Sequence, residues 1–195
     1  MTEQQPYTVL DNLPGFELRL YPSHLVAQVT VHSALEDAGG TAFAYLFGYI
    51  SGENTLGTGQ ARGGVAPVAG AAGSGGDPAA VARRIPMTAP VLLQPESLAG
   101  TYTVGFVLPA SLSAATAPDP ADPAVSLVAV PEARGAAARF TGRWTAHNYE
   151  DHAAALGEAV AAAGLTVRGL PRFALFDPPY KPWFLRRNEV VQTVE

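Results

Sequence analysis

The chain has 195 residues, of which 48% are apolar and 15% are charged, and its formal net charge is −5. This length and composition indicate a globular protein with a sizeable core rather than a disordered chain. The acidic balance argues against binding of a nucleic-acid backbone through a broad basic face. The absence of cysteine excludes disulfides, thiolate nucleophiles and cysteine-based metal centres.

The N-terminal segment shows neither the basic region nor the apolar region of a secretory signal. No apolar run approaches the roughly 20 residues that a transmembrane helix needs. We therefore expect a soluble, cytoplasmic protein without a membrane span.

Strands are predicted where apolar side chains alternate with polar ones or form short runs between turn residues. The predicted strands cover residues 16–21, 25–32, 84–93, 102–108, 125–130, 136–144, 172–176 and 189–194. One helix follows the second strand and another follows the strand that ends at 144, so strand–strand–helix–strand–strand occurs twice. This order predicts one antiparallel α+β domain over residues 1–195, with pseudo-symmetric halves at about 7–109 and 124–195.

The first helix has its apolar side chains at the spacing of one helical face: Phe43, Leu46, Phe47 and Ile50. Ser33 and Glu36 have the spacing of a capping box, but Gly39 and Gly40 weaken the first turns. We therefore expect regular helix from about Thr41 to the stop at Gly52. In the second helix, Asn148 is the predicted cap, Tyr149, Leu156 and Val160 line one face, and Gly164 ends it.

Sixteen of the 26 residues from Gly57 to Ala82 are glycine or alanine, which indicates an insertion into the first half. A flap over a site is one interpretation, and a tolerated surface loop is the favoured one. Beyond it, Pro86 and Pro90 bracket Met87 and Thr88. Because proline disturbs a strand ladder, Met87 is expected either to face a cavity or to fill an irregular gap in the core.

The segment from Asp177 to Val190 combines three prolines with Tyr180, Trp183 and Phe184. Such a stiff aromatic connection either forms a pocket wall or anchors the last strand. We favour the anchor, with Trp183 and Phe184 as architectural side chains.

The sequence contains no recognisable catalytic motif, which favours a binding protein over an enzyme. The four histidines show no metal-ligand spacing, so no metal site is predicted. Glu189 is the best single acidic candidate, because its apolar neighbours could direct it inward, where it needs a partner or takes a raised pKa. The other interpretation is a surface carboxylate paired with Arg186 or Arg187.

Four blocks of the sequence form a recognisable set. They are YTVL with FELRLY in residues 7–21, the helix residues from Phe43 to Gly52, PMTAPV at 86–91 with the strand at 102–109, and the segment DPP…PWFLRRNEV at 177–190. Together these blocks resemble the SOUL haem-binding family. The resemblance implies a distorted antiparallel β-barrel of two α+β repeats flanked by two helices, akin to effector-binding domains. It also implies binding of haem or a related tetrapyrrole.

In this family the haem cleft is associated with the first helix and the PMTAPV strand. Carried over, the apolar cleft residues are Phe43, Leu46, Phe47, Tyr49 and Met87, with Arg84, Lys181 or Arg187 near the propionates. Animal members carry a histidine at the position of Leu20, so that route to axial ligation is absent here. We therefore expect weak, transient haem binding, with His24 or Met87 as the remaining candidates for contact with the iron.

Three other classes of function stay open at this point. As an effector-binding-type module, the domain would hold a cationic or amphipathic small molecule against Glu189, with Tyr102 and Tyr180 completing the pocket. The same residues would serve an enzyme, as a raised-pKa acid beside a tyrosine. A scaffold would bind no ligand at all.

Overall fold

The computed structural model describes residues 2–55, 82–96 and 99–195. The glycine- and alanine-rich insertion, apart from Ala82, lies outside the described residues. The elements in chain order are β1 (Glu3–Gln4), β2 (Thr8–Leu13), β3 (Phe16–Tyr21), β4 (His24–His32), α1 (Leu35–Ser51), β5 (Asn54–Thr55), β6 (Thr88–Ala89), β7 (Val91–Pro95), β8 (Thr101–Val107), β9 (Asp119–Pro120), β10 (Ser126–Val130), β11 (Ala133–Phe140), α2 (Ala146–Ala162), β12 (Val167–Leu175), the 3₁₀ turn η1 (Trp183–Leu185) and β13 (Asn188–Val194).

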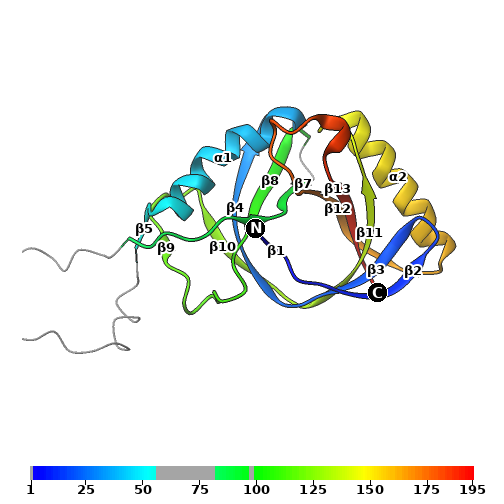
Figure 1. Cartoon of the computed structure of the whole chain (residues 1–195), viewed down its shortest axis with the longest axis horizontal. Coiled ribbons are helices and arrows are strands. Elements are labelled where there is room, and N and C mark those ends of the chain that lie inside the picture. The colour runs from blue at the N-terminus through cyan, green and yellow to red at the C-terminus, as the bar shows by residue number, and fades with distance from the viewer. Residues whose placement is uncertain (1, 56–81, 97–98) are drawn as a thin grey trace, which may run out of the picture.

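Nine strands form one antiparallel sheet in the order β10-β4-β8-β7-β12-β13-β11-β3-β2. β3 and β4 precede α1 and β7 and β8 follow it, while β10 and β11 precede α2 and β12 and β13 follow it. Strands pair across the two parts of the chain: β3 pairs with β11, and β10 pairs with β4. The halves meet where β7 pairs with β12. Figure 1 shows the strongly curved sheet with α1 over one half and α2 over the other. The antiparallel α+β class with two helices is therefore confirmed.

The resemblance also implied a distorted antiparallel β-barrel. In the described residues, β10 and β2 are the two edges of the sheet, and no strand pairing joins them. The sheet is therefore strongly curved, but strand pairing within the described residues does not close it into a barrel.

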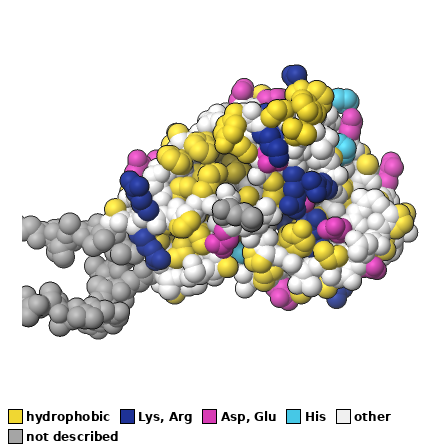
Figure 2. Space-filling view, viewed as in Figure 1, with side chains coloured by type: hydrophobic (Ala, Val, Ile, Leu, Met, Phe, Trp, Pro, Cys, Tyr) yellow, Lys and Arg dark blue, Asp and Glu magenta, His cyan; other side chains and the backbone are white. Residues whose placement is uncertain are grey.

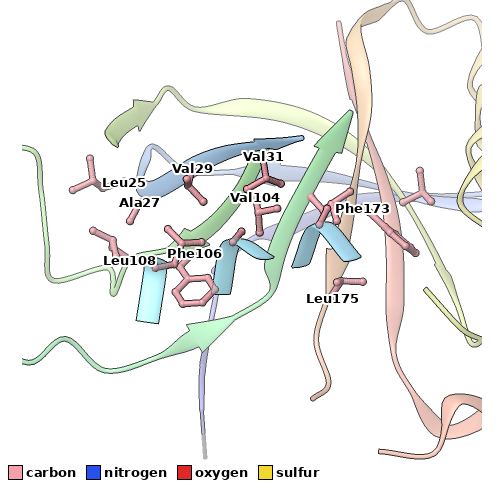
Figure 3. Close-up of a cluster of buried hydrophobic side chains, with 14 of the residues drawn as sticks. Leu25, Ala27, Val29, Val31, Val104, Phe106, Leu108, Phe173 and Leu175 are labelled. Carbon is pink, nitrogen blue, oxygen red and sulfur yellow. The ribbon is translucent and has the colours of Figure 1, made fainter. Parts of the chain in front are cut away.

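One face of the sheet packs against the helices and forms the main core. Alternate residues of β4 and β8 supply it, together with Phe173 and Leu175 of β12, as Figure 3 shows. From the helices come Leu46 and Tyr49 of α1, and Tyr149, Leu156 and Val160 of α2. The period-2 alternation that predicted these strands arises because successive side chains point in turn to the helix-covered face and to the opposite face.

The start of α1 differs from its prediction. The helix begins at Leu35 with Ala34 as N-cap, and no side chain caps it. Ser33 Oγ donates to the Ala34 carbonyl, and Glu36 accepts a hydrogen bond from the Ala146 backbone 2.9 Å away, so the capping box is not formed. The carboxylate of Glu36 instead connects the N-terminal ends of the two helices.

The other helix ends are closer to expectation. Gly52 ends α1 with a φ of +124°, a conformation that favours glycine. At the start of α2 the cap is Thr145, whose side chain accepts the backbone N–H of Asn148, so the predicted cap lies three residues too late. Gly164, with a φ of +72°, follows the C-terminus of α2 as predicted.

The C-terminal segment is held mainly by backbone and charged groups. Asp177 accepts hydrogen bonds from Lys181 and from the Arg187 backbone, and Arg186 donates to the carbonyls of Lys181 and Pro179. The side chains of Trp183 and Phe184 are 48% and 58% exposed. The anchor is therefore present, but these two aromatic side chains are surface residues and not buried architecture.

Within the described ranges, neither helix combines the length and hydropathy needed to cross a bilayer.

Candidate functional site

The sheet face opposite the helices carries a network of arginines and one buried carboxylate, and we call it the arginine face. Its strand residues include Arg19 and Tyr21 of β3, Arg172 of β12 and Glu189 of β13. Figure 2 shows Lys and Arg side chains gathered over the region of β12 and β13. Because β3 is exchanged into the second half and β11 lies between it and β13, residues from both ends of the chain meet here.

Glu189 is the centre of this network. Its side chain is 1% exposed, and Arg19 donates to Oε2 at 2.7 Å while Arg187 donates to Oε1 at 2.7 Å. Burial alone would lower the pKa of Arg19, but the hydrogen bond and the charge of Glu189 raise it overall. The carboxylate therefore sits between two permanent cations.

Two tyrosines complete the network beside these charges. Arg19 lies over the Tyr7 ring at 4.1 Å and donates to the Tyr21 hydroxyl at 3.2 Å. Burial raises the pKa of Tyr21 although Arg19 and Arg172 oppose the shift, so the phenol stays protonated at neutral pH. The Tyr21 ring lies against Gly135, where an added Cβ would come within 2.9 Å of the ring.

Three neighbouring cavities lie along the arginine face and share lining residues. One of about 370 Å³ contains Arg19, Arg187 and Glu189, and one of about 210 Å³ contains Tyr21, His24 and Arg172. A small gap of about 10 Å³ lies between them and is lined by Arg19, Tyr21 and Arg172. The face thus offers ligand-sized space beside its charges.

A second candidate lies on the opposite side of the sheet, on α1. Phe43 and Phe47 are 42% and 48% exposed, and their rings stack with centroids 5.3 Å apart. Phe43 also contacts Phe106 of β8 edge-on at 5.9 Å. Met87 is 40% exposed and precedes Thr88, whose hydroxyl donates to the carbonyl of Val107, the residue after Phe106. We call Phe43, Phe47 and Met87 the α1 aromatic surface.

The predicted haem residues divide between these regions and the core. Leu46 and Tyr49 are 0% and 1% exposed, so they support the helix from inside and cannot contact a surface ligand. Tyr49 donates to the Pro118 carbonyl at 2.9 Å, and burial raises its pKa to about 12. Arg84 is exposed three residues before Met87. The spacing of apolar residues placed Leu46 and Phe47 on one broad helical face. It could not tell which of the two is buried and which is exposed.

The two predicted cations near the C-terminus are engaged elsewhere. Lys181 pairs with Asp177 at 2.8 Å. Arg187 pairs with Glu189 and lies over the Phe176 ring at 3.8 Å. Arg187 therefore belongs to the arginine face rather than to the α1 aromatic surface.

The structure does not bring together Glu189, Tyr102 and Tyr180. Tyr102 packs against the core on the helix side, and Tyr180 is 88% exposed. Glu189 points inward, as one of the two interpretations proposed. Its partners are Arg187 and Arg19. Nothing in the sequence indicated the Arg19 contact, because Arg19 and Glu189 are 170 positions apart.

His24 lines the cavity of about 210 Å³ and has both ring nitrogens engaged. Nδ1 lies 2.9 Å from the Pro22 carbonyl and Nε2 lies 3.0 Å from the Gln5 amide nitrogen. These partners fit a neutral ring that donates from Nδ1 and accepts at Nε2. Burial lowers the pKa of His24 and the charge of Arg172 lowers it further, although the bond to Pro22 opposes the shift. In the described part of the chain, no three potential ligand side chains are grouped around a metal-sized site.

The fold defines an α+β protein with one curved antiparallel sheet and two helices. The C-terminal domain of EcmrR is similar with a TM-score of 0.61 at 10% identity, over 97% of this chain and 98% of that domain. An uncharacterized conserved protein from Listeria innocua is similar with a TM-score of 0.56 at 10% identity, over 92% of each chain. A hydrolase from the same organism is similar with a TM-score of 0.55 at 10% identity, over 95% of this chain and 94% of that one. At this identity the likeness concerns the fold alone.

The chain belongs to the SOUL heme-binding protein family, whose pattern it matches over residues 2–193. No match was found among curated proteins. The predicted family is thereby confirmed.

Proposed function

We propose that the protein binds haem or a related tetrapyrrole, weakly and reversibly, on the α1 aromatic surface. The observation that carries this proposal is the exposed, stacked pair Phe43 and Phe47 in a member of a heme-binding family. Adjacent large aromatic side chains that stay half exposed often mark a binding site on a protein surface. A porphyrin has a broad apolar face that can cover such a pair.

Met87 is the neighbouring side chain that completes the apolar contact. Phe43 touches Phe106, and the hydroxyl of Thr88 bonds to the next carbonyl along β8, so Met87 and the aromatic pair flank the same strand end. The exposed residue Arg84, three positions before Met87, supplies the cation for a propionate in this proposal. This arrangement supplies an apolar contact with a cation at its margin.

Met87 is the candidate ligand for the iron in this proposal. Leu20 replaces the histidine that animal members carry, and His24 lies on the arginine face with both nitrogens in hydrogen bonds. A surface contact with at most one thioether ligand explains why we expect weak binding.

A haemin titration of the purified protein tests the proposal. We expect a Soret shift and quenching of tryptophan fluorescence, with affinity reduced at least tenfold in the double variant Phe43→Ala/Phe47→Ala. Leu170→Ala, at a 48% exposed leucine of β12, is the matched control and should bind as the unchanged protein does. Equal affinity in the double variant and the control would disprove this site.

Met87→Ala and Met87→Leu separate the two roles of the methionine. If the thioether ligates iron, both variants lose the same absorption band. If Met87 contributes only apolar area, Met87→Leu binds as the unchanged protein does and Met87→Ala binds more weakly.

A further inference from the structure

The Arg172 guanidinium has no hydrogen-bond or ion-pair partner among the described residues, although the side chain is partly buried in the middle of the arginine face. Its guanidinium lies 5.2 Å from the centroid of the Tyr21 ring. No buried side-chain nitrogen or oxygen in the described residues lacks a hydrogen-bond partner, so the unbonded guanidinium donors reach open space. That space is the cavity of about 210 Å³, which Arg172 lines.

The lining of this cavity contains no acidic side chain. Polar groups come from His24, Gln28, Gln94 and Thr103, and apolar walls come from Val26 and Leu92. Its volume of about 210 Å³ suits a compact organic molecule. A cation placed here would meet the charge of Arg172 with no acidic side chain in the cavity lining.

The charges of the whole arginine face also favour an anionic ligand. Its three cavities are lined by five arginines, and the only acidic side chains among their lining residues are Glu17 and Glu189. Both glutamates already accept hydrogen bonds from Arg19, and Glu189 also from Arg187. The protein as a whole is acidic, so this local excess of positive charge is confined to one face.

We propose that the cavity beside Arg172 binds a small organic anion, whose carboxylate or phosphate group accepts hydrogen bonds from the Arg172 guanidinium. The planar fork of an arginine matches both groups through paired N–H donors. The body of the ligand packs against Val26 and Leu92, and Tyr21 holds the guanidinium from its other side.

Burial agrees with this assignment, because it lowers the pKa of Arg172 relative to an arginine in water. A bound anion would restore the favourable environment of the cation. The site is separate from the α1 aromatic surface, since it lies on the opposite face of the sheet.

Isothermal titration with benzoate, inorganic phosphate, benzamide and benzyltrimethylammonium tests the proposal on the full chain. Benzamide has the shape of benzoate without its charge, and the ammonium compound has the opposite charge. We expect benzoate or phosphate to bind, and benzamide and the ammonium compound to bind at least tenfold more weakly. Benzoate alone would identify organic carboxylates as the ligand class, and phosphate alone would identify phosphate groups.

Arg172→Gln should reduce the affinity for the anion at least tenfold. Arg168→Gln removes a charge from the same strand at an exposed residue paired with Glu195, and should leave the affinity unchanged. Arg172→Lys keeps the charge without the fork and should give intermediate affinity, so the proposal stays testable if Arg172→Gln does not fold. Equal anion affinity in the Arg172 and Arg168 variants, or preferential binding of the ammonium compound, would overturn the proposal.

Discussion

Arg19 and Glu189 form a buried ion pair at 2.7 Å between side chains that are 4% and 1% exposed. They lie 170 positions apart in the chain and on strands that are separated by β11. The exchange of β3 into the second half brings the pair together, so this contact ties the N-terminal strands to the C-terminal one. It also neutralises the one acidic residue that a cationic effector would need.

Glu189→Gln should lower the free energy of unfolding by about 3–5 kcal/mol, because it removes the buried counter-charge of Arg19 and leaves only the 40% exposed Glu17 as its ion-pair partner. Glu17→Gln is the control, since Glu17 also pairs with Arg19 but is 40% exposed, and it should cost about 1 kcal/mol or less. Urea unfolding monitored by circular dichroism measures both. A loss in Glu189→Gln no larger than in Glu17→Gln would contradict the structural role of the pair.

Gly135→Ala should destabilise the protein by about 1–3 kcal/mol, because the new methyl group would meet the Tyr21 ring at 2.9 Å and Val191 at 3.1 Å. Gly157→Ala in α2 meets nothing within 4 Å and should stabilise by about 0.5–1 kcal/mol. Thermal unfolding of the two variants should therefore shift in opposite directions. The displaced Tyr21 ring should also weaken anion binding at Arg172.

Stability should fall as the pH drops below 6.5, the ordinary pKa of histidine, because the folded state keeps His24 neutral while the unfolded chain takes up a proton. One proton accounts for at most about 1.4 kcal/mol per pH unit. His24→Asn removes this contribution and keeps an amide donor for the Pro22 carbonyl. We expect the difference in unfolding free energy between variant and parent to change between pH 7.5 and 5.5, and a constant difference would refute the assignment.

Leu46→Ala and Phe47→Ala should have opposite profiles although the residues are adjacent in α1. Leu46 is fully buried, so its truncation should cost about 2–5 kcal/mol of stability. Phe47 is half exposed and should cost about 1 kcal/mol, mainly its stacking with Phe43, while weakening haemin binding. Denaturant titration and haemin titration of the same samples distinguish the two. Comparable losses of stability would contradict the exposure of Phe47.

Local patterns were sufficient for much of the architecture. The alternation of Leu25, Ala27, Val29 and Val31 predicted a strand with one buried face, and those residues line the core. Thr8–Leu13 was missed as a strand because β2 is an edge strand with mostly exposed residues and no apolar alternation. The capping box at Ser33 and Glu36 failed because Glu36 has a stronger tertiary use at the N-terminus of α2.

The site depended much more on contacts between distant residues. Glu189 stood out in the sequence as an acid among apolar neighbours, but its partner Arg19 looked like an ordinary exposed residue of an alternating strand. Arg172 gave a similar signal, since it alternates with buried Phe173 and Leu175, and only the sheet order reveals that this side is also enclosed.

The sequence by itself determined the family, the α+β class, the two repeats and the face of each central strand, because these follow from local periodicity and from motifs that are contiguous in the chain. Only the tertiary structure decided which candidates are available to a ligand. Burial excludes Leu46 and Tyr49 from contact with a surface ligand. Ion pairs with Arg19 and Arg187 neutralise the charge of Glu189. The exchange of strands between the halves enclosed an arginine face, because long-range pairing sets which side chains become neighbours.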